Sequence, residues 1–254
     1  MKGIHRVVVY TKRLRYEFEL RRNITVIRGD SATGKTTLVD MVQEYANNPS
    51  GSPVELVCDK KCYVLSGTLK QSYHEFYRIY GIDLLREEVK PERIVAEDSN
   101  SGYQFFCGVC SDYNLECDTA GGKSNLFHVL NSGEDEKILA IADGVAFGSE
   151  IDKVIQLMKR RKNLVLYLPE SFEWLILLSD VLNDREIMHI LDNPYEYIES
   201  REYFSWERFF TKLLTEKSED TYLAYSKKSL NKAYLNDRVK LAILSQMKKI
   251  VFGN

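Results

Sequence analysis

The sequence lacks any apolar run of the roughly 18 residues that a membrane-spanning helix needs. It has only five cysteines in 254 residues, and an odd number of cysteines argues against a secreted, disulfide-linked scaffold. The amino-terminal stretch MKGIHRVVVYTKRLRYEF is too polar for a secretory signal. These absences together predict a cytoplasmic protein with no membrane partner.

Strong bias in composition is also absent. Hydrophobic residues make up 44% of the chain and charged residues 28%, which is ordinary for a folded globular protein and argues against disorder. A chain of this length is able to bury a full core, as one large domain or two small ones.

The cysteines allow two interpretations. The spacings Cys58-x3-Cys62 and Cys107-x2-Cys110 supply the four thiolates of a structural zinc site. However, the second pair lies in SGYQFFCGVCSDY, a run typical of a buried helix, where free thiols are common. We therefore expect buried thiols, with zinc as the alternative.

Charge is distributed unevenly along the chain although the total is only −2. Lys and Arg minus Asp and Glu give +4 for residues 1–90, −11 for residues 91–200 and +5 for residues 201–254. An acidic centre suits a divalent cation, and basic ends suit phosphate groups. A solvated surface without such partners is the alternative.

The hydrophobic pattern predicts an α/β fold. In residues 1–90 we expect strands at 5–11, 16–20, 24–29, 54–58 and 62–67, a helix from about 35, and a second helix from about 72 that ends near Gly81. From about residue 91 short apolar strands alternate with helices, which is typical of a parallel sheet covered by helices. From residue 184 onward the chain reads as helical. The predicted organisation is therefore three parts: 1–90, a βα module at 91–183, and a helical part at 184–254.

One motif stands out near the amino terminus. Residues 29–36 fit the pattern G-x-x-x-x-G-K-[ST], between an apolar run and an amphipathic helix. Backbone N–H groups in such a loop cradle phosphate oxygens, and glycines permit the turn. The lysine reaches the terminal phosphates, the hydroxyl binds Mg²⁺, and the helix directs its amino terminus at the anion. The residues predicted to bind the nucleotide are Gly29, Asp30, Ser31, Ala32, Thr33, Gly34, Lys35, Thr36 and Thr37.

This motif resembles the P-loop of nucleoside triphosphatases, and the strand pair before it is similar to the heads of ABC- and SMC-type ATPases. The resemblance implies ATP or GTP with Mg²⁺ as cofactors. Such a hydrolase also needs an acidic residue at the end of a neighbouring strand. Three positions qualify: Asp59, Glu97 with Asp98, and Asp143, of which Asp143 follows the most apolar strand.

The central part carries a second set of acids. Glu97, Asp143 and Glu170 each follow a predicted strand of the parallel sheet, so we expect all three at the carboxyl edge, where ligands of α/β folds bind. Convergent carboxylates are hard oxygen ligands for Mg²⁺ and support chemistry on phosphodiesters. We take these three as candidate catalytic residues, and Thr36, Glu97, Asp98 and Asp143 as candidate metal ligands.

The order of these features resembles the TOPRIM fold of topoisomerases, primases and OLD-family nucleases, which combine an ABC-type head with a TOPRIM module. Glu97, the glycine turn Gly121-Gly122 and Asp143 match the family's glutamate, turn and first aspartate over residues 92–180. The second aspartate of its Asp-x-Asp motif is replaced by Val145. Substitutes for it would be Glu150, Asp152 or Glu173. Segments such as AGGKSNLF and LPESFEWLIL are also similar to bacterial P-loop proteins of no settled function.

Simpler explanations stay open for several residues. Strand-end acids also act as helix N-caps, and Lys123 in its turn is explained equally by contact with phosphate or with solvent. Trp174 suits the core better than a base-stacking site. The four histidines show no ligand spacing. The aromatic and basic tail, residues 195–249, is explained by binding of DNA or RNA backbone, by a helical cap, or by the surface of a homo-oligomer.

Three hypotheses follow. The first is a nucleotide-binding ATPase coupled to a Mg²⁺-binding, TOPRIM-like module that acts on nucleic acid. The second is a single P-loop domain, an NTPase or kinase in which Asp143 is the Mg²⁺-orienting acid. The third is a non-catalytic, nucleotide-gated binding protein. One sheet containing both Lys35 and Asp143 would favour the second hypothesis, whereas two sheets would favour the others.

Overall fold

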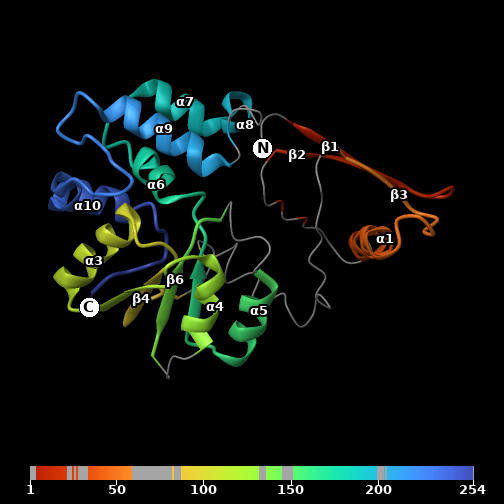
Figure 1. The fold of residues 1–254 in the computed structure, drawn as a ribbon, viewed down its shortest axis with the longest axis horizontal. Helices are drawn as coiled ribbons and strands as arrows, with labels where there is room; N and C mark the ends of the chain where they lie inside the picture. The colour runs from red at the N-terminus through yellow and green to blue at the C-terminus, as the bar shows by residue number, and fades with distance from the viewer. Residues whose placement is uncertain are drawn as a thin grey trace.

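A computed structural model describes most of the chain: residues 4–21, 25, 27, 34–58, 82, 87–131, 136–144, 151–198, 203 and 205–253, without the side chains of 151 and 152. Its strands form two separate sheets, one near the amino terminus and one in the centre of the sequence (Figure 1). The predicted strand at 24–29 and the predicted elements at 62–85 lie outside the described residues, apart from single positions.

The amino-terminal sheet is antiparallel and has the order β2-β1-β3. Its apolar face, which includes Val7 and Val9, packs against Leu38 and Met41 of the first helix. Alternation of buried and exposed side chains along the strands gives one apolar face and one polar face. The bounds are β1 (His5–Tyr10), β2 (Arg15–Leu20), α1 (Lys35–Asn47) and β3 (Glu55–Val57). These elements were all predicted.

The central sheet is parallel and has the order β5-β4-β6-β7. Each strand is four residues long; β4, β6 and β7 are mostly buried because helices cover both faces, whereas the edge strand β5 is partly exposed. The bounds are β4 (Arg93–Ala96), β5 (Glu116–Thr119), β6 (Ile138–Ile141) and β7 (Leu164–Tyr167). The predicted α/β class and parallel sheet are therefore confirmed.

Successive strand residues point to opposite faces, so neighbours such as Ile94 and Val95 belong to different cores. The core with Ile94 includes buried side chains of α3 (Ser101–Tyr113) and α6 (Phe172–Leu178). The core with Val95 includes those of α4 (Lys123–Asn131) and α5 (Ile151–Arg160). Asn114 ends α3 in the left-handed conformation at φ 54°, which asparagine tolerates better than most residues.

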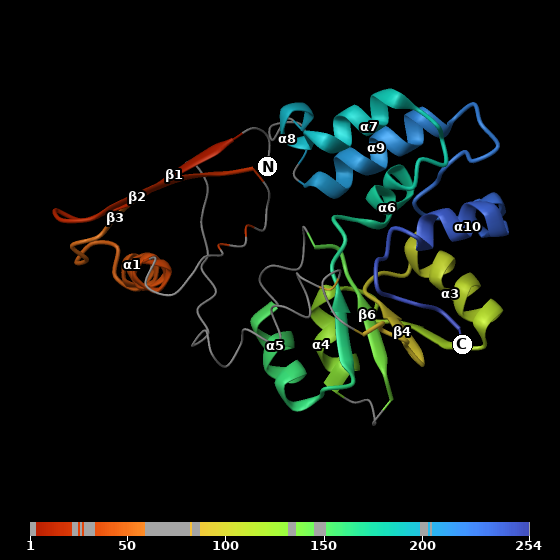
Figure 2. The same cartoon turned by 180° about the vertical axis from the view of Figure 1, so that it is seen from behind.

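The carboxyl-terminal part extends the core of α3 and α6. Trp206, Phe210 and Tyr234 are fully buried in that core, and Val89 pairs with Ile250 just before the parallel sheet begins. The elements are α7 (Arg185–Asp192), α8 (Pro194–Tyr197), α9 (Trp206–Ser218), η3 (Lys232–Leu235) and α10 (Asp237–Leu244). Figure 2 shows α9 and α10 beside α6 and α3. In the described part of the chain, every helix is too short or too polar to reach across a lipid bilayer.

Candidate functional site

The strand order of the parallel sheet determines where a ligand site is expected. The chain runs from β4 to β5 on one side and then crosses to β6 on the other side of β4. Ligands of open α/β sheets bind at this reversal, outside the carboxyl ends of the two strands concerned. Glu97 follows β4 directly and Asp143 lies two residues after β6. The two predicted acids thus flank the reversal.

Glu97 and Asp143 are in direct contact. The backbone N–H of Asp143 donates a hydrogen bond of 3.0 Å to Oε2 of Glu97, and the backbone N–H of Glu97 donates to the carbonyl of Ile141 at 2.9 Å. The second bond continues the parallel ladder by one residue, so the sheet itself positions Glu97.

Asp98 is tied to the neighbouring loops. Its carboxylate accepts a hydrogen bond of 3.3 Å from the Asn100 amide, and its carbonyl accepts one of 2.5 Å from the Thr119 hydroxyl. Asn100 is the N-cap residue of α3, but its side chain makes no capping bond there. Asp98 therefore lies beside the amino terminus of α3 without capping it, contrary to the simpler N-cap explanation.

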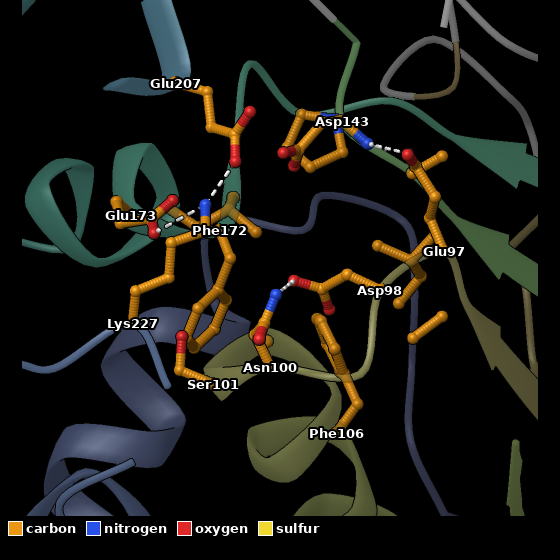
Figure 3. Close-up of a pocket in the computed structure, with 16 residues that line it drawn as sticks. Glu97, Asp98, Asn100, Ser101, Phe106, Asp143, Phe172, Glu173, Glu207 and Lys227 are labelled. Carbon is orange, nitrogen blue, oxygen red and sulfur yellow. Dashed lines mark hydrogen bonds and ion pairs between the residues drawn. The ribbon is translucent and has the colours of Figure 1, made fainter. Parts of the chain in front are cut away.

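These acids line a cavity of about 120 Å³ at the carboxyl edge of the sheet. Figure 3 shows Glu97 and Asp98 on one side, Asp143 above them, and Glu207 and Lys227 on the other side. Apolar side chains form much of the floor. The lining residues with polar side chains are Glu97, Asp98, Asn100, Ser101, Asp143, Glu173, Glu207 and Lys227.

Three of these lining residues come from beyond the parallel sheet. Glu173 lies in the first turn of α6, Glu207 lies in the first turn of α9, and Lys227 lies between α9 and η3. The Lys227 ammonium forms ion pairs with Glu207 and, at 3.4 Å, with Glu173. Glu207 and Lys227 were not predicted, because nothing in their local sequence marks them as facing a strand edge more than 60 residues away.

A buried hydrogen-bonded chain supports this side of the cavity. The Tyr225 hydroxyl donates to Oε1 of Glu173 at 2.8 Å and lies 2.5 Å from the Ser101 hydroxyl. All three side chains are buried. Because a buried carboxylate is costly unless it is paired and hydrogen-bonded, Tyr225 and Lys227 together explain how Glu173 is tolerated there.

The carboxyl groups at the strand ends have perturbed proton affinities. Burial raises the pKa of Glu97 above its ordinary value, and the neighbouring charges of Asp98 and Glu207 raise it further. Burial likewise raises the pKa of Asp98. Burial, followed by the charges of Glu207 and other carboxylates, holds the pKa of Asp143 well above its usual range. Each shift means that the ionised form is disfavoured as the site stands.

Lys227 has the opposite balance. Burial alone would lower the pKa of its ammonium, but the charges of Glu173 and Glu207 outweigh burial and raise it. Lys227 is therefore a permanent cation in the cavity.

The glycine turn after β5 closes another side of the site. Gly121 and Gly122 have φ angles of 68° and 134°, which L side chains rarely adopt. The N–H of Gly122 donates to the Glu97 carbonyl at 2.7 Å. Lys123, exposed at the start of α4, is close enough to lower the pKa of Glu97 partially.

The carboxyl-terminal half of the phosphate-loop motif lies at the start of α1, the helix that packs on the amino-terminal sheet. Gly34 precedes α1 with φ 81°, and Lys35, Thr36 and Thr37 form the helix's first residues, with both threonines exposed. The Tyr16 hydroxyl donates to the Gly34 carbonyl at 3.0 Å. Gly29, Asp30, Ser31, Ala32 and Thr33 lie outside the described residues.

The other predicted residues whose side chains the structure describes do not line the cavity. Glu170 is partly buried after β7 but does not line the cavity. Cys107 and Cys110 lie on α3, as expected for a buried helix, and Trp174 packs against the core. Asp59, Cys62, Val145 and Glu150 lie outside the described residues.

Metal ligands do not converge fully. Within the described residues, no group of three or more carboxylate, thiol or imidazole side chains is arranged to hold a metal ion by itself.

Comparison with protein-family models, with curated proteins and with solved structures found no match to this chain.

Proposed function

We propose that the protein binds a nucleoside triphosphate, ATP or GTP with Mg²⁺, and couples it to a TOPRIM-like, Mg²⁺-dependent site that acts on nucleic-acid phosphodiesters. The observation that carries the second half is the contact between Glu97 and Asp143 at the reversal of the parallel sheet. Acids at these two strand ends are what the resemblance to TOPRIM modules implies.

The donor set fits Mg²⁺. Glu97, Asp98 and Asp143 offer hard carboxylate oxygens around one cavity. Burial is the main cause of their raised pKa values, and neighbouring carboxylates add to it. A divalent cation would favour the ionised forms. Mg²⁺ keeps several waters and needs only one or two carboxylates from the protein, so the lack of a three-ligand cage among the described residues is compatible with it.

The protein groups have separate tasks in this proposal. Bound Mg²⁺ supplies charge stabilisation for a phosphodiester that is being attacked. Glu97 and Asp143 hold the ion at the sheet edge, and Asp98 balances its remaining charge. The exposed basic residues Lys232, Arg238 and Lys248 supply contacts to the phosphate backbone, which are electrostatic and independent of sequence.

The nucleotide half depends on the start of α1. Gly34 has the positive φ that a phosphate loop uses where it enters its helix, and Lys35 and Thr36 follow at the helix amino terminus, where anions are favoured. Lys35 begins α1, which packs on the amino-terminal sheet, whereas Asp143 follows β6 of the central sheet. This arrangement favours two modules over a single domain with Asp143 as its Mg²⁺-orienting acid. A cytoplasmic location, where nucleotide is abundant, is part of the proposal.

The test combines nucleotide and nucleic-acid assays on the same preparations. Binding and turnover of Mg·ATP and Mg·GTP are measured for the natural protein, for Lys35→Ala and for Lys12→Ala, an exposed lysine in the turn between β1 and β2. Nicking of supercoiled DNA is measured for Glu97→Gln and for Glu116→Gln, which changes an exposed acid at the far end of β5.

We expect Lys35→Ala to abolish nucleotide binding and Glu97→Gln to abolish nicking but not nucleotide binding, with both controls unchanged. Nucleotide binding through Lys35 without hydrolysis or nicking would replace the proposal by a nucleotide-gated binding protein. No nucleotide binding at all would remove the phosphate-loop half.

A further inference from the structure

The cavity contains five carboxylates but one ammonium among the described residues that line it. The ammonium of Lys227 is paired with Glu173 and Glu207, which lie on the side contributed by the helices. No described cation forms an ion pair with Glu97, Asp98 or Asp143, which lie on the side of the strand ends. Lys227 thus forms its ion pairs on the helix side of the cavity, whereas the charges of Lys227 and Lys123 act on the strand-end acids only from a longer distance.

Hydrogen bonds to α3 hold the backbone at Lys227 in place, so this lysine is not simply a flexible residue of the surface. The N–H of Ser101 donates to the Lys227 carbonyl at 2.9 Å. The Gln104 side chain makes two hydrogen bonds to the same segment. Its amide N–H donates to the Lys228 carbonyl at 3.0 Å, and its amide oxygen accepts from the Leu230 N–H at 2.8 Å. Three hydrogen bonds thus attach the segment to the first turns of α3, which start at the cavity.

The side chain is also held at its end. Glu173 is almost fully buried, with 3% of its side chain exposed, and it is oriented by the Tyr225 hydroxyl. Figure 3 shows the Lys227 nitrogen between the carboxylates of Glu173 and Glu207. Removing an ammonium from such a position would leave a buried carboxylate without its counter-charge, which is unfavourable.

We propose that Lys227 acts as a built-in cation that occupies the Glu173–Glu207 side of the cavity, so that the site takes one divalent ion, at Glu97 and Asp143, and not two. This inference rests on the proposed metal site and adds its stoichiometry and the residue that determines it. Two-metal sites hold their ions about 3.5–4 Å apart between shared ligands. The fixed ammonium of Lys227 repels a second divalent ion, and its ion pairs keep Glu173 and Glu207 from binding that ion.

The test is the binding of Mn²⁺, a spectroscopic substitute for Mg²⁺, to the full chain without nucleotide or nucleic acid. Stoichiometry and affinity are measured by isothermal titration calorimetry and by the electron paramagnetic resonance signal of unbound Mn²⁺. The variants are Lys227→Met, Lys227→Arg, which keeps the charge, and Lys228→Met, which removes the charge of the adjacent exposed lysine. Circular dichroism melting curves verify folding of each variant.

We expect one Mn²⁺ per chain for the natural protein, for Lys227→Arg and for Lys228→Met. Lys227→Met should bind a second Mn²⁺, or bind the first at least about tenfold more tightly, because one repelling charge a few ångströms away is removed. Two Mn²⁺ ions in the natural protein would overturn the role of Lys227 while leaving the metal site intact. So would a Lys227→Met variant whose Mn²⁺ stoichiometry and affinity equal those of the natural protein.

A different result would count against the metal site itself. If neither the natural protein nor Lys227→Met binds Mn²⁺, both the proposed site and this inference are wrong. Should Lys227→Met not fold, the stoichiometry in the natural protein and in Lys227→Arg still decides, since two ions in either contradicts the inference.

Discussion

The backbone N–H of Asp143 donates a hydrogen bond of 3.0 Å to the Glu97 carboxylate, joining the ends of β4 and β6 through a candidate ligand. The bond uses Oε2. Among the described residues, no donor hydrogen-bonds to Oε1. The main chain of Asp143 thereby orients the Glu97 carboxylate, which lines the cavity.

The first prediction concerns how much these acids destabilise the folded protein when no metal is bound. Asp143 lies among the negative charges of Glu97, Glu173 and Glu207, so removing its charge should relieve repulsion. With EDTA at pH 7, Asp143→Asn should increase the free energy of unfolding by about 1–3 kcal/mol, because a buried carboxyl group that lacks a cation partner is removed. Urea denaturation followed by circular dichroism measures this change.

The same variant should lose its response to Mg²⁺. Ligands that bind only the native state stabilise it by mass action, so millimolar Mg²⁺ should raise the melting temperature of the natural protein but not of Asp143→Asn. Asp192→Asn, at the exposed end of α7, is the control and should behave like the natural protein in both experiments. Destabilisation of Asp143→Asn under EDTA would indicate a structural acid.

Much of the fold could be predicted from the sequence because its signals are local. Three strands of the parallel sheet, β4, β6 and β7, are short apolar runs, each followed by turn residues and a helical pattern. The fourth, β5, is polar and is marked by the glycine turn that follows it, and α3 has the predicted bounds Ser101–Tyr113. Glu97 and Asp143 could also be predicted, since the carboxyl ends of parallel strands meet at one edge of the sheet whatever the strand order.

The other half of the site could not be predicted, for physical reasons. Glu207 and Lys227 reach the cavity because α9 and the segment after it pack on α6 and α3, and packing between distant segments leaves no periodic signal. Lys227 appeared as one of many basic residues in the tail. Glu170 was predicted from its place after β7, whereas Glu173, one turn later on α6, is the residue that lines the cavity.

The second prediction concerns the turn at Gly34. A Cβ added there would lie 2.6 Å from the Tyr16 hydroxyl, and the φ of 81° is unfavourable for any residue with a Cβ. Gly34→Ala should therefore lower stability by about 1–2 kcal/mol and weaken binding of a fluorescent ATP analogue.

Tyr16→Phe separates the two contributions at this turn. It removes the hydrogen bond to the Gly34 carbonyl, worth about 0.5–1.5 kcal/mol, and leaves φ unchanged. Tyr45→Phe on α1 is the control. We expect a moderate loss of nucleotide affinity for Tyr16→Phe and none for Tyr45→Phe. Equal affinities for all three proteins would show that this turn does not shape the nucleotide site.

The third prediction concerns pH. Asp184 caps α7 by accepting from the N–H groups of Glu186 and Ile187, and its pKa is lowered first by the hydrogen bond from Lys217 of α9 and then by these N–H groups. Because its pKa is lowered in the folded protein, ionised Asp184 stabilises the fold at pH values above its ordinary pKa, near 3.9. This stabilisation is lost as the pH falls through the lower pKa of the folded state. Asp184→Ala should cost about 1 kcal/mol at pH 7.

Asp184→Asn distinguishes charge from capping, because asparagine caps as well as aspartate. It should be slightly less stable than the natural protein at pH 7, by an amount that salt reduces since the ion pair is partly exposed, and equally stable near pH 2. Melting temperatures from pH 2 to pH 7 measure both effects. A difference between Asp184→Asn and the natural protein that grows toward low pH would contradict the assignment.

The last prediction concerns the core that the sheet shares with the carboxyl-terminal helices. Trp206 is fully buried in α9, within the same cluster as Ile94 of β4 and Phe105 of α3. Trp206→Ala should lower the free energy of unfolding by about 3–5 kcal/mol. The chain's other tryptophan, Trp174 on α6, then reports unfolding by fluorescence. Because one core holds α6 and α9 together, the fluorescence of the natural protein, which reports both tryptophans, should show a single transition in urea. Two fluorescence transitions would mean that α9 is able to unfold without α6, and Glu207 and Lys227 could then leave the cavity while the strand-end acids stay in place.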